Sequence, residues 1–413
     1  MRIRRKYLFY TLAFTSAIIG AVMATVDAII STNFITDPWS LGLACFLIGV
    51  PISVGLTCIF SIPIGPKSLG ARFIDPSFHR IRLLTKQEVK YHILAGIGNS
   101  TLTIGYFFVL SIFDDPSVVL PFSQVAILYL LIVESVSEKN IPTLTEVQST
   151  LIVTFGAILG SLSLQGSLSV EALVIVFLVV NPGWVLFTTY QRKLKLIKIN
   201  EKPNDSLNIR TWNVLFSCLF SLVFIMIFDA INGTSYLTSA VDAAIQYKEW
   251  VGTTMFLTFF TYVFYIRALG IGKASITQAV RASTIIFVIP FTLLVSYMGL
   301  ITPFSTDPTL LIMKIIGITL MILGILSTAF TLVKAYIFIT IKPGYSTEET
   351  IQKLWNIHGV SRVVATAGPY DMIVKIHTRT LVKGYEKIIK KIEEIEAIDD
   401  FKWQSVLKEW EDI

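Results

Sequence analysis

A single arginine lies inside a long apolar segment of this 413-residue chain, where an ionised side chain is costly and is usually functional. In ITQAVRASTIIFVIPF, Arg281 shares one helical face with three polar residues, Thr277, Gln278 and Thr284. A guanidinium in this position can bind a carboxylate or a phosphate through two parallel hydrogen bonds. The alternative is a structural arginine whose charged end extends to the membrane surface.

Asp27 is a second ionisable residue in such a segment, on a helical face that also carries Gly20, Ala24 and Ser31. Its carboxylate can pair with Arg281, carry a coupling proton or bind the amine of a substrate. The alternative is a position at the outer membrane interface, because the apolar segment around Asp27 is long.

Uncharged polar residues in neighbouring segments extend this predicted site. In VNPGWVLF, the residues Asn181 to Gly183 are predicted to break a helix in the middle of the membrane, although a plain kink fits them equally well. The others can also serve as hydrogen-bond partners between helices. The residues predicted to line a transport cavity are Arg281, Gln278, Asp27, Asn181, Gln124, Asn99, Tyr106 and Tyr262.

The sequence contains no combination of residues typical of a catalytic, metal or nucleotide site. It has no nucleotide-binding Gly-rich loop and no Ser/His/Asp set, and its four histidines are scattered. Cys45, Cys58 and Cys218 each lie in an apolar run, as buried small residues do. We therefore expect a protein that is not an enzyme and that needs neither a metal nor a cofactor.

The composition indicates an integral membrane protein with a water-soluble tail. Hydrophobic residues make up 54% of the chain and charged residues 15%, with a mean hydropathy of +0.69. Soluble domains carry about 25% charged residues. The last 79 residues differ, with 11 Lys/Arg and 12 Asp/Glu, so we expect this tail to lie in water rather than in the membrane.

Ten segments are long and apolar enough to be predicted transmembrane helices: 8–32, 41–61, 92–113, 117–137, 146–163, 170–190, 211–231, 250–269, 275–298 and 309–332. With the N-terminus in the cytoplasm, 20 of the 23 basic residues before the tail fall on the inner side, Arg210 among them. We therefore expect a multi-pass protein of the cell membrane with both termini in the cytoplasm. The basic charge marks topology and gives no reason to expect nucleic-acid binding.

Ten spans divide into two five-helix halves of opposite orientation, at about 8–163 and 170–332. The sequence favours this reading through short turns containing Ser117 or Ser275 and through closing helices with spaced glycines. The first half also has the short turn DDPSVVLPFSQVAILYLLIVE between its third and fourth helices and an acidic residue at the inner end of the fourth helix (Glu134 or Glu138). In these features residues 8–332 resemble the ten-helix EamA-type carriers of the drug/metabolite transporter superfamily. The second half departs from that pattern, since VSYMGLIT stands where its acidic residue would be.

After Lys334 the hydrophobic period changes from 3.6 residues to 2. Strands are predicted at AYIFITI, VSRVVATAG, DMIVKIHT and DDFKWQSVLKEW, with helices at STEETIQKLWNI, which begins with a capping box, and at TLVKGYEKIIKKIEEIEAI. The order β-α-β-β-α-β is the ferredoxin-like pattern. The predicted architecture is a ten-helix membrane domain, 1–334, followed by an α+β domain, 335–413.

The segment HGVSRVVATAGPYDMIVKI resembles the core of the effector-binding (RAM) domain of the Lrp/AsnC regulators. That resemblance implies pairing through the sheets and binding of small effectors, usually amino acids, near Gly368, Tyr370 and Asp371. From the residues alone, Gly368 can be only a turn residue and Asp371 only a cap at the start of a strand. The DNA-binding segment of those regulators has no counterpart here.

Together these features favour a secondary carrier of small metabolites, with amino acids or related anionic or zwitterionic solutes as the expected cargo and export as the expected direction. The cytoplasmic tail is expected to sense a small ligand, such as an amino acid, and to make the protein at least a homodimer. Two alternatives fit the same residues: a membrane receptor that does not transport, and a carrier whose tail only dimerises it.

Overall fold

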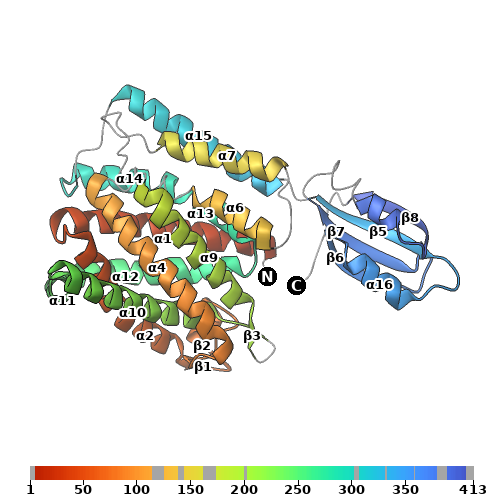
Figure 1. Cartoon of the computed structure of the whole chain (residues 1–413), viewed down its shortest axis with the longest axis horizontal. Helices are drawn as coiled ribbons and strands as arrows, with labels where there is room; N and C mark the ends of the chain where they lie inside the picture. Colours follow the sequence, from red (N-terminus) through yellow and green to blue (C-terminus); the bar gives the residue numbers. More distant parts are fainter. Residues whose placement is uncertain are drawn as a thin grey trace. The chain divides into compact units, whose positions relative to one another are not determined.

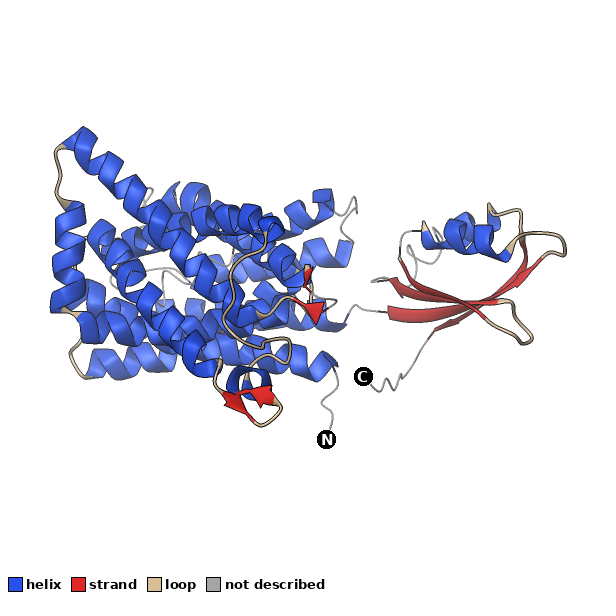
Figure 2. Ribbon diagram, turned by 90° about the horizontal axis from the view of Figure 1, so that it is seen from below, coloured by secondary structure: helices blue, strands red, loops and turns tan. Residues whose placement is uncertain are grey.

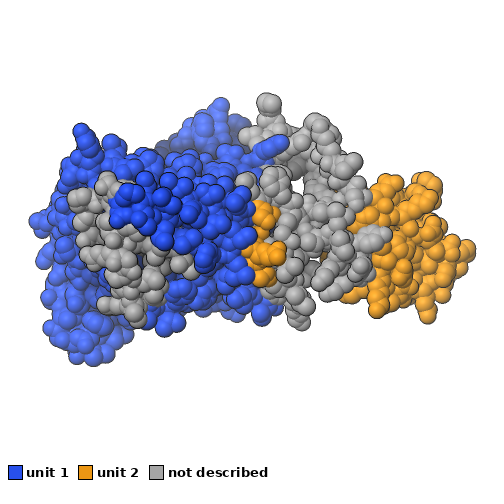
Figure 3. Space-filling model, turned by 90° about the horizontal axis from the view of Figure 1, so that it is seen from above, with its two compact units in different colours: residues 1, 3–141, 150–324 blue, residues 2, 142–149, 325–413 orange. Residues whose placement is uncertain are grey.

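The chain forms two compact units in the computed structural model (Figure 3), one of residues 3–141 and 150–324 and the other of residues 142–149 and 325–413. The structure describes residues 5–113, 125–137, 144–160, 174–199, 202–301, 307–330, 333–357, 359–378 and 388–405. Gln124, Glu138 and the predicted turn at Ser117 lie outside the described residues.

The first unit is built of helices, with two short hairpins, β1–β2 (Pro63–Ile64, Lys67–Ser68) and β3–β4 (Lys198–Ile199, Lys202–Pro203). Figure 1 shows the helices crossing one another as a bundle. Their bounds are α1 (Arg5–Asn33), α2 (Pro38–Phe60), α3 (Leu69–Phe73), α4 (Lys86–Phe113), α6 (Ala126–Ser137), α7 (Leu144–Gly160), η1 (Val176–Val180), α9 (Asn181–Leu196), α10 (Ser206–Asn232), α11 (Tyr236–Gln246), α12 (Lys248–Leu269), α13 (Ala274–Arg281), α14 (Thr284–Tyr297) and α15 (Pro308–Phe330).

Five helical stretches are long and apolar enough to cross a membrane: Tyr7–Asn33, Pro38–Phe60, Lys86–Ile112, Ser206–Asn232 and Ala274–Tyr297. The last of them contains both α13 and α14. The five stretches indicate a membrane protein. Large apolar side chains such as Val223, Ile227 and Ile231 of α10 are exposed, which suits a surface facing hydrocarbon rather than water. Helical residues occur in each of the ten predicted segments, but the number of spans remains a prediction.

Three sets of contacts define the packing of the helical unit. Helix α1 packs against α12 and α14, α4 packs against α9 and α10, and α2 packs against α10, α11 and α12. Helix α11 occupies a stretch predicted as an outer loop; its Ala240 packs in a cluster with Leu43 and Ile225.

Glycines permit the closest helix crossings. A Cβ added to Gly98 of α4 would lie 2.6 Å from the Phe187 nitrogen, and one added to Gly183 of α9 would lie 2.9 Å from the Leu102 nitrogen. The side chain of an L-residue has no room between α4 and α9 at these positions. Likewise, a Cβ at Gly156 of α7 would lie 2.6 Å from the carbonyl oxygen of Gly317 in α15, so one spaced glycine of each closing helix lies at this crossing.

The predicted break at Asn181–Gly183 is wrong, because the chain stays helical there. The residues of η1 form one π-helical turn, and α9 follows it directly with Pro182 in its first turn. The Asn181 N–H donates to the Val176 carbonyl, five residues back. Pro182 has no N–H to donate, and a π-turn immediately before it accommodates this within a continuous helix.

The predicted helix 275–298 is divided into α13 and α14 directly after Arg281. The Ser283 N–H donates to the Val280 carbonyl and the Ile285 N–H to the Ala282 carbonyl, both three residues back. These bonds make a tight 3₁₀-type turn between the two helices. Arg281 is therefore the last residue of a two-turn helix rather than part of a long one.

The second unit contains a four-stranded antiparallel sheet in the order β6-β7-β5-β8, shown as red arrows in Figure 2. Its strands are β5 (Val333–Ile341), β6 (Val360–Ala365), β7 (Met372–Thr378) and β8 (Ile398–Ser405), and helix α16 (Thr347–Trp355) follows β5. With the first and third strands central, this is a ferredoxin-like arrangement, as predicted.

One face of this sheet carries the core of the second unit. Ile337, Ile339 and Val374 are fully buried and pack against Leu354 of α16 and Ile392 of a second helical segment at 388–393. These residues alternate along the strands, as period 2 requires. The Ser346 side chain accepts the Glu349 N–H, so the predicted capping residue does begin α16.

Candidate functional site

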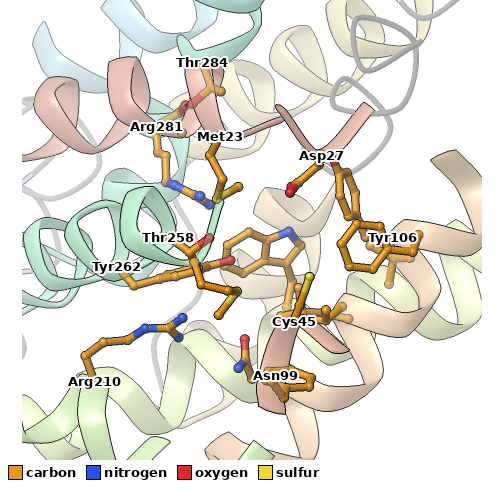
Figure 4. Close-up of a pocket in the computed structure, with 18 residues that line it drawn as sticks. Met23, Asp27, Cys45, Asn99, Tyr106, Arg210, Thr258, Tyr262, Arg281 and Thr284 are labelled. Atoms are coloured by element: carbon orange, nitrogen blue, oxygen red, sulfur yellow. Dashed lines mark hydrogen bonds between the residues drawn. The ribbon is translucent and has the colours of Figure 1, made fainter. Parts of the chain in front are cut away.

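A cavity of about 90 Å³ lies within the helical unit, lined by residues of α1, α2, α4, α9, α10, α12, α13 and α14. Five predicted site residues line it: Asp27, Asn99, Tyr106, Tyr262 and Arg281. Figure 4 shows Arg281 on one side of Tyr262 and Arg210 on the other, with the Asp27 carboxylate pointing into the cavity from across it. The walls between these charges include the aromatic residues Trp184 and Phe107.

Asp27 is held by α12 rather than by an arginine. Its side chain is 5% exposed, and its Oδ1 accepts a 2.5 Å hydrogen bond from the Thr254 hydroxyl. Among the described residues it has no ion pair, so its predicted pairing with Arg281 is not formed in this structure. The second carboxylate oxygen, Oδ2, is not used in that hydrogen bond.

Arg281 extends from the end of α13 over a group of aromatic rings. Its guanidinium carbon lies 4.7 Å from the Trp184 ring centroid, 5.1 Å from that of Tyr265 and 5.4 Å from that of Tyr262. Cation–π contacts of this kind stabilise a buried positive charge without neutralising it. The Nε of Arg281 has no hydrogen-bond partner in the described part of the chain.

Arg210 is a cavity residue that the sequence reading missed, since it was counted among the inner basic residues that set the topology. It is 1% exposed, lines the same cavity, and places its guanidinium carbon 4.5 Å from the Tyr262 ring centroid. Its Nε and Nη1 have no hydrogen-bond partner among the described residues. The missed signal was its position one helical turn inside α10, in SLNIRTWNVLF, on a face with Asn213 and Ser217.

Asn99 and Tyr106 contribute polar atoms from α4. The Asn99 amide donates a 2.8 Å hydrogen bond to the Ser217 hydroxyl of α10, which fixes its orientation. The Tyr106 hydroxyl is buried and has no hydrogen-bond partner in the described residues. An unpaired hydroxyl facing a cavity is available to a ligand or to water.

Two other predicted site residues that the structure describes do not line the cavity. Gln278 is buried beside it, and its amide oxygen accepts a 3.1 Å hydrogen bond from the Tyr265 hydroxyl. Asn181 is fully buried where η1 meets α9. Gln124 lies outside the described residues.

A second polar group, also missed from the sequence, joins the ends of helices α9 and α10 to the segment before α4. The Lys195 Nζ lies 2.6 Å from the Asp75 Oδ2, which also accepts hydrogen bonds from the Ser206 N–H at 2.9 Å and its hydroxyl at 2.7 Å. Burial alone would raise the pKa of Asp75, but the positive charge of Lys195 and these hydrogen bonds outweigh it and lower the pKa to about 2.

A bidentate pair extends this polar group. Arg82 donates from Nη1 and Nη2 to the two carboxylate oxygens of Glu88 at 2.8 and 2.7 Å, and from Nη2 to the Asn204 side-chain oxygen at 2.7 Å. Lys195 also donates to the Asn204 carbonyl at 2.6 Å. Asn204 therefore connects the two ion pairs in one network, which closes this end of the helical unit.

Glu134 joins α6 to the beginning of α13. Its two oxygens accept the backbone N–H groups of Ala274 at 2.7 Å and Ser275 at 3.1 Å, and Arg192 donates to it at 3.0 Å. A carboxylate satisfies the free N–H groups at a helix N-terminus and interacts well with the helix dipole. The acidic residue predicted at the end of the fourth helix thus supports the short helix that carries Arg281.

In the second unit, the predicted effector residues lie on one turn between β6 and β7. The Asp371 Oδ2 accepts a 2.7 Å hydrogen bond from the Ile341 N–H, which joins the residue before β7 to the end of β5. The Tyr370 ring lies 5.2 Å from that of Phe338. Gly368 has no left-handed backbone, and a Cβ there would meet nothing within 4 Å.

No group of three or more potential metal ligands occurs among the described residues. No curated protein matches the chain. One similar solved structure, described only as "Crystal structure of protein", is 14% identical, covers 76% of this chain and 98% of its own, and has a TM-score of 0.47. A similarity at that level carries no argument about fold or activity.

One family model does match, over the second unit. It is described as Lrp/AsnC ligand binding domain and covers residues 334–412. The match agrees with the strand order and with the helix after the first strand. The C-terminal segment of this chain is therefore an Lrp/AsnC ligand-binding domain.

Proposed function

We propose that the protein is a secondary carrier of small anionic or zwitterionic metabolites, with amino acids as the best candidates, and that its C-terminal domain senses such a metabolite and adjusts the flux. The observation that carries the proposal is the cavity itself. The Arg281 guanidinium and the Asp27 carboxylate line the same cavity inside the membrane unit, and the Arg281 Nε has no hydrogen-bond partner among the described residues. A carboxylate and an ammonium group are the natural partners of these two charges.

The helix contacts support an internal repeat. The helices can be numbered along the chain with α3 and α11 left out and with η1–α9 counted as one helix. The contact of α1 with α12 then joins the first and eighth, and that of α4 with α9 joins the third and sixth. These are equivalent pairs when the second five helices repeat the first five. The contacts of α2 with α12 and of α4 with α10 are equivalent in the same way. Inverted repeats around a central site are typical of secondary transporters.

The C-terminal domain supports regulation by a ligand. Domains of this family bind small effectors such as amino acids and often oligomerise, and the match covers the whole segment after α15. A sensor of cytoplasmic solute on a carrier of the same class of solute fits an exporter that responds to accumulation. The charged cavity favours transport over a receptor whose helices serve only as an anchor.

Purified full-length protein in liposomes tests the proposal. We expect uptake of at least one labelled amino acid or organic acid, and loss of that flux in Arg281→Ala. The matched control is Arg72→Ala, an exposed arginine that lies outside the cavity. A broad panel that shows neither flux nor binding would remove the carrier interpretation, and unchanged kinetics in Arg281→Ala would give that arginine a structural role.

A further inference from the structure

The cavity has two buried arginines at one end, and their positions are linked by a shared ring. The guanidinium carbons of Arg210 and Arg281 lie 4.5 and 5.4 Å from the same Tyr262 ring centroid, so they are at most about 10 Å apart. The two residues come from α10 and α13, far apart in the sequence. Figure 4 shows both guanidinium groups directed into the cavity.

Neither arginine has a counter-charge in the described part of the chain. The ion pairs there are Arg82 with Glu88, Arg192 with Glu134, and Lys195 with Asp75. Arg210 and Arg281 are 1% and 7% exposed, and both keep N–H groups without a hydrogen-bond partner. Two positive charges buried this close together repel each other and are costly unless anions join them.

Asp27 does not fill that need. An added Cβ at Gly20 would lie 3.8 Å from the Arg281 Nη2, which places the guanidinium beside Gly20 on α1. Asp27 is seven residues further along the same helix, which places its backbone about 10 Å beyond Gly20 at 1.5 Å per residue, and Figure 4 shows its carboxylate across the cavity from both arginines. The carboxylate therefore stands at the other end of the cavity from the arginine pair.

We propose that Arg210 is a second substrate-binding residue and that the solute carries two anionic groups, one for each guanidinium. This inference rests on the proposed carrier function and narrows its substrate class to small dianions. Dicarboxylates, including acidic amino acids, have this chemistry. A monoanion would leave one buried guanidinium unpaired, and for this reason the site discriminates against it.

Equilibrium binding to the purified full-length protein tests this inference without depending on flux. The probes are succinate and glutamate as dicarboxylates, with butyrate and leucine as matched solutes that have a single carboxylate. We expect at least one dianion to bind about tenfold more tightly than its single-carboxylate match. Equal affinity for butyrate and for every dianion in wild-type protein would overturn the proposal.

The variants separate Arg210 from Arg281. Arg210→Gln should reduce dianion affinity to the level of the single-carboxylate solutes while their own binding, through Arg281, stays unchanged. Arg210→Lys keeps the charge and should restore part of the preference. An equal loss for both solute classes, or no loss, would show that Arg210 does not hold the second anionic group.

The two proposals fail in different ways. Dianion binding that depends on Arg210, without flux into liposomes, would leave this inference standing and remove the carrier function. Flux of a dicarboxylate at the same rate in wild type and Arg210→Gln would keep the carrier function and remove this inference.

Discussion

The Lys195 Nζ lies 2.6 Å from the Asp75 Oδ2, and both side chains are at most 6% exposed. No other ion pair among the described residues is buried on both sides to this extent, since Arg82 and Arg192 are 24% and 22% exposed in theirs. The pair joins the end of α9 to the segment that follows α3. It is therefore expected to hold that end of the helical unit closed.

Asp75→Asn should destabilise the protein strongly, because it leaves the Lys195 ammonium buried without a counter-charge. We expect a loss of about 3–5 kcal/mol, the range measured when one partner of a buried pair is removed. Thermal unfolding in detergent measures the effect. Asp242→Asn, at an exposed aspartate, is the control and should change little. The double variant Asp75→Asn with Lys195→Met should regain part of the loss, and no recovery would argue against the pair as the cause.

The same carboxylate should give the protein an acid-sensitive step. Its pKa is lowered from 3.8 to about 2, so the folded state holds it ionised more readily than the unfolded chain does. The stabilisation is complete above pH 3.8 and is lost as the pH falls toward about 2, with a size of about 2 kcal/mol. Thermal unfolding measured between pH 6 and pH 2.5 should show the melting temperature decreasing as the pH drops below 3.8. In Asp75→Asn this part of the decrease should be missing.

Helices α7 and α15 cross closely at Gly156 and Gly317, so a larger side chain at Gly156 should destabilise the protein. Gly156→Val places a Cβ 2.6 Å from the Gly317 carbonyl oxygen, and the helices must separate to accept it. We expect a loss of about 1–3 kcal/mol, as for other overpacked interiors. Gly55→Val is the matched control, because a Cβ there meets nothing within 4 Å. Equal melting temperatures for both variants would show that α7 and α15 do not need this close approach.

Substitution of Gly368 should affect ligand binding or pairing of the Lrp/AsnC domain without affecting its thermal stability. The Gly368 backbone is not left-handed and a Cβ has free space, so Gly368→Ala should leave thermal stability unchanged. If an effector or a second copy approaches this turn closely, the methyl group should weaken amino-acid binding or pairing. Calorimetry with amino acids and light scattering of the full-length protein measure the two effects. Gly344→Ala, at φ +93°, is expected to lower stability instead.

The C-terminal fold was predictable because its signals are local. Alternating apolar residues such as Ile337 and Ile339 indicate strands, and Ser346 ahead of Glu349 indicates a helix start. Asp27, Arg281 and Tyr262 were also identifiable, because polar residues in apolar segments need a reason to be there.

The rest depended on tertiary contacts that the sequence does not contain. Arg210 is near the start of its helix, where a positive charge usually marks the membrane surface, and only its approach to Tyr262 of another helix places it in the cavity. Asp75 and Lys195 are 120 residues apart and looked like ordinary loop charges. At Pro182 the hydrophobic period does not predict the π-helical turn that lets the helix continue past a residue without an N–H.

The offset of Asp27 from the arginines along α1 gives the cavity an electric polarity. One end is positive and the other negative, and the walls between them are aromatic and apolar. In such low-dielectric surroundings the field is strong, so a bound zwitterion turned the wrong way would place like charges face to face. In the proposed carrier, a solute would therefore cross in a single orientation, with its acidic end always leading or always trailing.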